Sequence, residues 1–402
     1  MRVLLTTESY LPYISGVTIS IDSLARGLGA QGHEVLVLAP RPQGGALVSP
    51  VGSPGPAPRH AWLDSYQAPR VAPPGYRMPW PNPAAPALRQ ARDFHPDVVH
   101  AHSPFVSGVA ARMLARAAGA PLVFTHHTRF AGYGHYLGPL ARPGARATDL
   151  FLRGFWGGCA AIIAPSADLA AEIRARLPVE QADRVHVIPT GIDVDAIQAL
   201  APIDPRPAAG WSPDDVVVGA LGRLAPEKSP ELLMEAVARA ADNMPGLRLL
   251  SIGSGPSAPD LRMRAARHDL VGRVTFTGAR PRMEALARIA GADLFGFTSR
   301  TETQGLVLAE ALASGLPAIA VDGPGVRDSI RDGVDGIVVS ADPAESLPQR
   351  LAAVLLSVAS DPGRRAAMRD RARGDADRFS VQRRVGEVAG LYARLQAQKQ
   401  RQ

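Results

Sequence analysis

Two glutamates, Glu302 and Glu310, bracket the expected start of a helix, and their chemistry suits a ligand with both phosphates and hydroxyls. An apolar strand ends shortly before Glu302, and a helical pattern begins near Gly305. The free backbone amides of Gln304, Gly305 and Leu306 at such a helix N-terminus favour a phosphate group. The two carboxylates can accept hydrogen bonds from hydroxyls on either side of it. These residue types at this spacing predict a nucleotide-sugar site.

A lysine supports this prediction, because the chain otherwise uses arginine. Of its 44 basic residues, 42 are arginine and only Lys228 and Lys399 are lysine. Lys399 lies in a polar tail, whereas Lys228 follows an expected strand at residues 216–221, in the segment GRLAPEKSP. An ammonium is a compact point charge and a guanidinium is a planar fork, so a site that needs a point charge explains Lys228. The alternative explanation is that Lys228 is one lysine retained by chance, without a role in a site.

Length and composition indicate a globular protein of two domains. A chain of 402 residues with 46% apolar residues is too long for one ordinary core. The single cysteine, Cys159, excludes an internal disulfide and any cysteine metal cluster. No apolar run approaches the ~20 residues needed to cross a bilayer. A strand begins directly after Met1, without a leader pattern, which predicts a cytoplasmic protein.

The positive charge is concentrated in the first half of the chain. Residues 1–190 contain 17 arginines, no lysine and 11 acids. Two interpretations of this positive charge stay open. It keeps a chain of high isoelectric point soluble, or it attracts the chain to an anionic membrane surface. Nucleic acid is disfavoured as a partner, because no basic run interleaved with aromatic residues and no nucleic-acid-binding motif occurs.

The pattern of strands and helices predicts an α/β fold with two Rossmann-like, doubly wound domains that face each other across a cleft. Residues 1–190 form the first, acceptor-side domain and residues 191–379 the second, donor domain, while a helix at about 380–402 folds back onto the first. Within the first domain we expect extended segments with short strands near Ala68–Ala72, and a loop up to Ala147 before a helix from Asp149.

Five candidate residues each follow a predicted strand. Ligands of doubly wound sheets bind at the carboxyl ends of the strands, so this coincidence predicts a site in the cleft. The residues are Gly16, His102, His127, Arg223 and Glu302.

One pair of acids is a decoy. Asp193 and Asp195 form an Asp-x-Asp pattern, whose carboxylates could hold Mg²⁺, but they lie in the connector between the domains. Asp193 precedes a helical pattern, so we interpret it as a helix cap.

Several segments together resemble the retaining glycosyltransferases of family 4, which have the GT-B fold, and the similarity covers nearly the whole chain. They are ESYLPYISGVTISI, PDVVHAHSPF, FTHHTRFAGYGHYL, VHVIPTGID, GRLAPEK and ETQGLVLAEALASGLPAIA. The opening loop together with HTRFAGYGHYL is most similar to members that glycosylate membrane lipids of the diacylglycerol or phosphatidylinositol type.

The resemblance implies a role for each donor-side residue. Arg223 and Lys228 match the cations that bind the diphosphate, Glu302 matches the acid that touches the donor sugar, and Glu310 the acid that holds the ribose. Gln304 stands where the family usually has phenylalanine, which leaves the backbone role intact and changes the packing.

On the acceptor side the resemblance implies two further contacts. Gly16 matches the glycine that allows its loop to approach the diphosphate, and His127 matches the histidine that reaches the transferred sugar. The same resemblance implies a UDP-sugar or GDP-sugar as substrate and no metal or other cofactor.

A basic and aromatic stretch before residue 157 suits an anionic membrane surface. Six arginines and one acid, Asp149, lie between His102 and Trp156. The membrane or acceptor candidates are Arg142, Arg146, Arg153 and Trp156. Phe151 and Phe155 are four residues apart, so on a helix they can instead face the core.

The resulting hypothesis is a retaining, metal-independent hexosyltransferase that acts on a membrane lipid such as diacylglycerol and is peripheral at the inner face of the cell membrane. No carboxylate is an evident covalent nucleophile, so the acceptor is expected to attack the face that the diphosphate leaves. A glycosyltransferase with a soluble acceptor, and a sugar-nucleotide epimerase or hydrolase of the same fold, are the alternatives.

Overall fold

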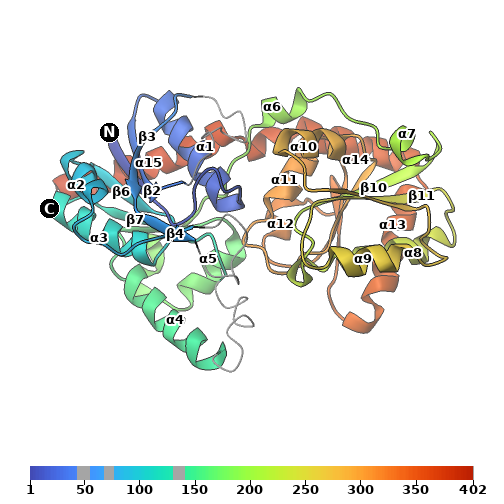
Figure 1. The fold of residues 1–402 in the computed structure, drawn as a ribbon, viewed down its shortest axis with the longest axis horizontal. Helices are drawn as coiled ribbons and strands as arrows, with labels where there is room; N and C mark the ends of the chain where they lie inside the picture. The colour runs from blue at the N-terminus through green and yellow to red at the C-terminus, as the bar shows by residue number, and fades with distance from the viewer. Residues whose placement is uncertain (43–54, 68–76, 130–140, 402) are drawn as a thin grey trace. The chain divides into compact units, whose positions relative to one another are not determined.

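The computed structural model describes residues 1–42, 55–67, 77–129 and 141–401 (Figure 1). The chain divides into two compact units. The first comprises Met1–Gly191 together with Val381–Gln402, and the second comprises Ile192–Ser380.

The first unit contains a seven-stranded sheet with the order β3-β2-β1-β6-β7-β8-β9, in which every pairing is parallel. The strands are β1 (Arg2–Thr6), β2 (Glu34–Pro40), β3 (Arg59–Leu63), β6 (Val98–Ala101), β7 (Leu122–Thr125), β8 (Ala161–Ala164) and β9 (Val185–Val187). Two short strands, β4 (Ser65–Gln67) and β5 (Arg77–Pro79), pair antiparallel beside this sheet.

Helices cover both faces of this sheet, because successive side chains of β1 are buried on opposite faces. Leu4 packs in one cluster with α2 (Pro86–Asp93), α3 (Val106–Ala118), α4 (Ala141–Trp156) and α5 (Ala167–Arg174). Val3 and Leu5 point to the opposite cluster, with α1 (Gly16–Ala30) and α15 (Val381–Gln400).

The C-terminal helix α15 belongs to the first unit, although it follows the second in the chain (Figure 1). It lies close to α1, since a side chain at Gly27 would come within 2.6 Å of Val385 Cγ2. Its Tyr392 is fully buried, and the Tyr392 hydroxyl lies 2.6 Å from Nδ1 of His100.

The second unit repeats the plan with a six-stranded parallel sheet of order β12-β11-β10-β13-β14-β15. The strands are β10 (Val216–Leu221), β11 (Leu247–Ile252), β12 (Val274–Gly278), β13 (Leu294–Phe297), β14 (Ala318–Val321) and β15 (Gly336–Val339). Its helices are α6 (Val194–Gln198), α7 (Arg206–Ala209), α8 (Pro230–Ala241), α9 (Ala258–Ala265), α10 (Arg282–Ala290), α11 (Leu306–Ala313), α12 (Val326–Ser329), α13 (Leu347–Ala359) and α14 (Pro362–Gly374). The two sheets confirm the predicted α/β fold with two Rossmann-like units.

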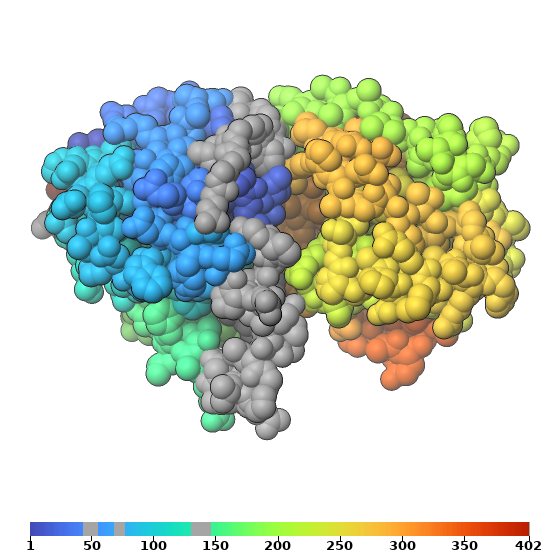
Figure 2. All heavy atoms as spheres, viewed as in Figure 1, coloured from blue at the N-terminus to red at the C-terminus, as the bar shows by residue number. Residues whose placement is uncertain are grey.

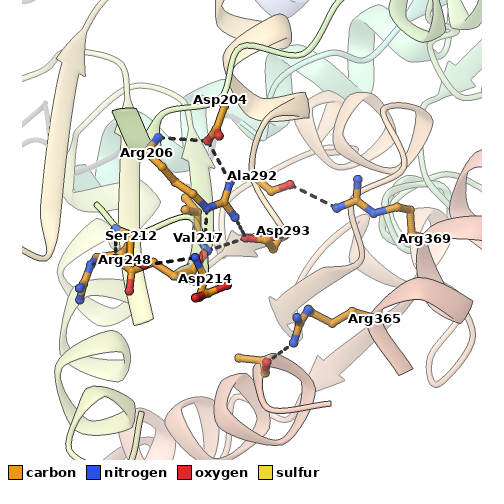
Figure 3. A network of polar contacts seen from close by, with 12 residues as sticks. Asp204, Arg206, Ser212, Asp214, Val217, Arg248, Ala292, Asp293, Arg365 and Arg369 are labelled. Carbon is orange, nitrogen blue, oxygen red and sulfur yellow. Dashed lines mark hydrogen bonds and ion pairs between the residues drawn. The ribbon is translucent and has the colours of Figure 1, made fainter. Parts of the chain in front are cut away.

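A polar network fastens the amino ends of the central strands in this unit (Figure 3). Asp293, directly before β13, accepts a hydrogen bond from the backbone amide of Val217 at 2.8 Å and pairs with Arg206. Arg206 Nε donates to the carbonyl of Asp215 at 2.9 Å, and Arg248 Nε donates to the Asp215 carboxylate at 2.9 Å. This network ties the connector to the sheet at the edge opposite the carboxyl ends.

Two local predictions need comment. Helix α4 begins at Ala141 and not at Asp149, because Pro143 lies in the first turn, where its missing amide hydrogen costs nothing. The strands expected near Ala68–Ala72 lie outside the described residues, and the described strands on either side are β4 and β5.

Candidate active site

In the second unit, two loops at the carboxyl edge of the sheet are joined by hydrogen bonds. Thr298, directly after β13, donates its hydroxyl to the carbonyls of Lys228 at 3.2 Å and Ser229 at 2.8 Å. Thr301 donates to the carbonyl of Glu227 at 3.2 Å. The loop after β10 is therefore held against the loop after β13, and this contact positions Lys228.

The same contact brings together two predicted site residues. Lys228 and Glu302 form an ion pair, with side chains that are 30% and 22% exposed. Arg223 lies on the same loop with a 45% exposed side chain, 3.6 Å from Glu227 at the nearest charged atoms. Both cations can reach solvent, so both are available to an anionic ligand, and Lys228 would exchange a carboxylate for a phosphate.

Helix α11 begins as the sequence indicates, directly after a residue with unusual backbone geometry. Gly305 is its N-cap, with a φ of 72° in the left-handed region, and no side chain caps this terminus. The amides of Leu306 and the next residue therefore lack helical partners, which makes the terminus a site for an anion. Gln304 is buried beneath this turn, against Gly325, where a side chain would come within 2.7 Å of the Gln304 Cα.

Glu310 is fully buried in α11 and has a partner that the sequence did not reveal. Its carboxylate forms an ion pair with Arg282, the first residue of α10. Burial lowers the pKa of Arg282 to about 10, so the guanidinium stays charged at neutral pH. Among the described residues neither Glu310 oxygen accepts a hydrogen bond of regular geometry, which leaves acceptor capacity for hydroxyl groups. The ribose role of Glu310 stays a prediction.

In the first unit, four histidines gather behind the carboxyl edge of the sheet. His102, just after β6, places Nδ1 at 2.8 Å from Nε2 of His127, and the two rings stack with centroids 5.1 Å apart. His100 lies between the hydroxyls of Tyr392 and Thr125, at 2.6 and 2.7 Å. His127 is thus oriented by a neighbouring imidazole.

Burial keeps these histidines neutral. It lowers the pKa of His127 to about 4 and those of His100 and His126 to about 3, and the pKa of His102 falls well below its ordinary value for the same reason. A neutral imidazole can donate one hydrogen bond and accept another, so His127 is suited to orienting a sugar hydroxyl without contributing charge.

The loop before α1 carries the glycine predicted to approach the diphosphate. Gly16 is the first residue of α1 and is exposed, and the preceding Ser15 caps the helix by accepting a hydrogen bond from the Thr18 amide at 3.2 Å. Upstream in the same loop, Glu8 is buried and accepts hydrogen bonds from the Ser103 hydroxyl and the Ser107 amide at 2.8 and 3.1 Å. Gly16 is therefore accessible, and its role stays a prediction.

The membrane candidates have different positions in α4. Arg146 is exposed, and Arg153 is half exposed and paired with Asp149 at 2.8 Å, while the side chain of Arg142 lies outside the described residues. The prediction for Trp156 was wrong, because its side chain is only 1% exposed. It is four residues after Leu152 on a helix, and this spacing directs it into the core.

The hydrogen bonds of Asp193 show what the first residue of the Asp-x-Asp pattern does. Asp193 is the N-cap of α6 and accepts a hydrogen bond from the Ala196 amide at 3.0 Å. The interpretation of Asp193 as a helix cap is confirmed.

Comparisons with known proteins identify the family. The profile described as Glycosyltransferase Family 4 matches residues 14–196, and the profile described as Glycosyl transferases group 1 matches residues 204–375. A GDP-mannose-dependent alpha-mannosyltransferase of Mycobacterium tuberculosis is 33% identical over 84% of both chains. An alpha-monoglucosyldiacylglycerol synthase of Streptococcus pneumoniae is 28% identical over 84% of this chain and 74% of its own.

Solved structures agree with this fold. Anabaena Alr3699/HepE in complex with UDP superposes with a TM-score of 0.73 at 22% identity, over 98% of this chain and 100% of that one. This likeness shows the GT-B fold. The chain belongs to glycosyltransferase family 4, and it is a glycosyltransferase that takes its sugar from a nucleotide sugar.

Proposed function

We propose that the protein transfers a hexose, with retention of anomeric configuration and without a metal ion, from UDP-hexose or GDP-hexose to a hydroxyl of a membrane lipid such as diacylglycerol. The reaction takes place at the inner face of the cell membrane. The observation that supports it most is the pairing of Lys228 with Glu302 beside the uncapped start of α11.

This arrangement suits the diphosphate and the donor sugar at once. Amides at the start of α11 bind one phosphate, and the ammonium of Lys228 and the guanidinium of Arg223 neutralise the negative charge that grows as the glycosidic bond breaks. Two fixed cations supply the charge that a divalent metal supplies in other enzymes. Glu302 is left to accept hydrogen bonds from the sugar once Lys228 turns to the phosphate.

The proposed retention follows from how the carboxylates are used. Glu302 is engaged with Lys228, and Glu310 is buried against Arg282. Neither is set up as a covalent nucleophile, so the acceptor hydroxyl attacks the face from which the diphosphate departs. The departing diphosphate oxygen takes the proton of the acceptor hydroxyl, and a new glycosidic bond replaces the sugar–phosphate bond.

The proposal of a hexose donor and a lipid acceptor is based on the names of the relatives. One relative is named for GDP-mannose and another for a glucosyl diacylglycerol, so the sugars in their names differ and both are hexoses. No described helix is both long and apolar enough to cross a bilayer. A lipid acceptor therefore requires a surface that meets the membrane.

Helices α3 and α4 offer such a surface. Phe105, Val109 and Met113 recur every four residues along α3 and are 38%, 47% and 52% exposed. On α4, Phe151 is 40% exposed, and its ring stacks on Phe105 at 5.7 Å between centroids. Leu150 is 73% exposed, and helix α4 lies at the surface of its unit (Figure 2).

Arginines accompany this apolar surface, which we call the α3–α4 face. Arg146 and Arg153 are exposed on α4 and lie four and three residues from Leu150, on the same side of the helix. Apolar side chains at a membrane interface, combined with arginines that attract anionic lipids, give reversible peripheral binding.

Transfer from labelled UDP-glucose, GDP-mannose and other nucleotide hexoses to diacylglycerol dispersed in anionic vesicles tests the function. We expect a labelled glycolipid with one donor, and its loss with Lys228→Met. Equal release of nucleotide with and without any acceptor would instead indicate a hydrolase, and transfer only to soluble sugars would indicate the soluble-acceptor alternative.

Vesicle co-sedimentation tests the membrane surface. Replacing Arg146 and Arg153 by glutamine removes two charges, each worth about 1 kcal/mol near an anionic surface, so binding should weaken by about 10- to 30-fold. The matched control replaces Arg89 and Arg92, two exposed arginines of α2, by glutamine. If both double variants bind vesicles equally, the α3–α4 face is not the membrane surface.

A further inference from the structure

The first unit contains a small cavity between α1, α15 and the strands β6 and β7. Its volume is about 40 Å³. A buried water needs about 10–15 Å³ of such space, so the cavity has room for about two or three water molecules. The polar residues of its wall that bear on its chemistry are Ser20, His100, His102, Thr125, Thr190 and Arg384.

One nitrogen of His102 turns toward this cavity. The ring is almost completely buried, and its Nδ1 lies 2.8 Å from Nε2 of His127. Among the described residues, Nε2 of His102 has no hydrogen-bond partner. The two nitrogens of an imidazole point in divergent directions, and His127 does not line the cavity, so Nε2 is the nitrogen of His102 that faces it. A buried polar atom without a partner is costly, so a partner is expected here.

The neighbouring ring of His100 cannot be that partner. Its centroid lies 4.1 Å from the centroid of His102, but both of its nitrogens are already engaged. The Tyr392 hydroxyl lies 2.6 Å from Nδ1 of His100, and the Thr125 hydroxyl lies 2.7 Å from Nε2. The contact between His100 and His102 is therefore one of ring faces, and the partner of His102 must come from the cavity.

Water suits this cavity better than an apolar occupant. Buried waters occupy polar cavities in which two to four groups bond to them, whereas apolar cavities stay dry. The hydroxyls of Ser20 and Thr190 lie 3.2 Å apart, and both residues line the cavity. Arg384 lines it as well, with a side chain that is only 19% exposed. Together with Nε2 of His102, these groups supply enough partners for a bridging water.

The guanidinium of Arg384 determines how such a water is oriented. A guanidinium only donates hydrogen bonds, so a water beside it accepts one and keeps both of its own hydrogens to donate. If one of these goes to Nε2 of His102, that nitrogen carries a lone pair, and the single proton of the neutral ring lies on Nδ1. Nδ1 of His102 then donates to Nε2 of His127, so the proton of His127 also lies on its Nδ1.

We propose that this cavity binds a structural water that sets the tautomers of His102 and His127, so that His127 presents an N–H group to the transferred sugar. Ser20, Thr190 and Arg384 are positioning residues, because they act through the water and the two rings. Nε2 of His127 is taken by His102, so of its two nitrogens only Nδ1 can serve a sugar hydroxyl. The inference rests on the proposed function in assigning His127 to the sugar, whereas the water and the tautomers are properties of the protein alone.

NMR of protein with ¹⁵N-labelled histidine tests the tautomers without donor or acceptor. Long-range proton–nitrogen correlation distinguishes the two neutral forms of imidazole, and His102→Gln and His127→Gln assign the signals. We expect the proton on Nδ1 in both rings of the wild type. Arg384→Met should shift the tautomer ratio of His102 toward Nε2–H by about 10-fold, and Arg384→Lys, which keeps a group that only donates, should restore most of it. A wild-type His102 with its proton on Nε2 would overturn the proposal.

Arg383→Met is the matched control for Arg384→Met. Arg383 is the preceding residue of α15 and also reaches Glu387, at 3.6 Å, but its side chain is 58% exposed and does not line the cavity. This variant should leave both tautomers unchanged, and thermal unfolding checks that each variant is folded. The proposal is refuted if Arg384→Met keeps the tautomer ratio of His102 within about 2-fold of the wild type, or if both variants change it equally.

A high-resolution crystal structure of the wild type tests the water itself. We expect density for a water within hydrogen-bond distance of Nε2 of His102, and a dry cavity would refute the site. Should the protein transfer no sugar, the proposed function fails, and the crystal structure and NMR still test the water and the tautomers.

With an active enzyme, kinetics test the consequence for transfer. Arg384→Met should lower kcat by about 3- to 10-fold while the donor KM stays near the wild-type value, and Arg383→Met should change neither. A shifted tautomer with an unchanged kcat would refute the role of the His127 proton.

Discussion

Replacing Lys228 by methionine removes the ammonium and keeps an apolar stem of similar length, so it isolates the charge that we assign to the leaving group. Two unit charges 4 Å apart interact by about 4 kcal/mol at the effective dielectric constant of a partly buried site. Loss of a single group that stabilises developing negative charge costs about 3–4 kcal/mol in characterised enzymes, which is about 100- to 1,000-fold in kcat. The Lys228 side chain is 30% exposed, which places it between surface and interior, and we expect a decrease in this range.

The assay is release of nucleoside diphosphate at saturating donor and acceptor, with the fold monitored by thermal unfolding. Lys228 also pairs with Glu302, and a partly exposed pair contributes about 1 kcal/mol or less, so Tm should fall by no more than about 2–4 °C. Lys228→Arg keeps the charge and changes its shape, and it should restore only part of the activity.

Lys399→Met is the matched control, because Lys399 is the other lysine of the chain and is exposed near the end of α15. Its kcat and Tm should equal those of the wild type. If Lys228→Met is folded and retains kcat within about 3-fold of the wild type, Lys228 does not stabilise the leaving group and the reasoning is refuted.

Three further predictions concern other parts of the site. Gly305→Ala forces a side chain into a left-handed conformation at a cost of about 1–2 kcal/mol. It should weaken donor binding, measured by calorimetry, by about 5- to 30-fold. Gly386→Ala is the control, because a side chain at this position of α15 would meet no neighbouring atom, and it should leave donor binding unchanged. His102→Ala removes the ring that orients His127. It should lower kcat by about 10-fold or more while the donor KM stays near the wild-type value. An unchanged kcat would contradict this positioning role. Because the pKa of His127 is about 4 when folded and ~6.5 when unfolded, stability is fully present above pH ~6.5 and is lost as the pH falls toward 4, by about 3 kcal/mol for this one group. Urea unfolding at pH 7.5 and pH 5 measures the part of this loss that occurs above pH 5, about 2 kcal/mol for His127. The loss should be smaller in His127→Gln, and a pH-independent midpoint would rule it out.

Much of the fold follows from patterns in the sequence. The strand expected at residues 216–221 is β10, and the apolar strand expected shortly before Glu302 is β13, because each is a short apolar run beside a polar loop. The break near Gly191 coincides with the boundary between the two units. These signals are local, so a sequence reveals them directly.

The start of α4 was predicted less well. Pro143 and the glycine after it indicate a loop, yet a proline in the first turn of a helix loses no hydrogen bond. Trp156 was also misassigned, since aromatic residues near arginines occur both at membrane interfaces and on the inner face of an amphipathic helix. Only the packing of α4 on the sheet distinguishes the two.

For the candidate site, sequence patterns identified residues better than their partners. The pairing of Lys228 with Glu302 joins two predicted residues, and the rarity of lysine provided the signal. Arg282 is one of 42 arginines, and nothing in its neighbourhood in the sequence indicates its contact with Glu310.

The central claim is transfer of a hexose from a nucleotide donor to a lipid hydroxyl with retention. The most direct measurement is proton NMR of the glycolipid formed from an α-linked nucleotide hexose and diacylglycerol in anionic vesicles. The account predicts a product whose new glycosidic bond is α, formed by the wild type and not by Lys228→Met. A β-linked product, or free hexose released at the same rate whether or not lipid is present, would contradict it.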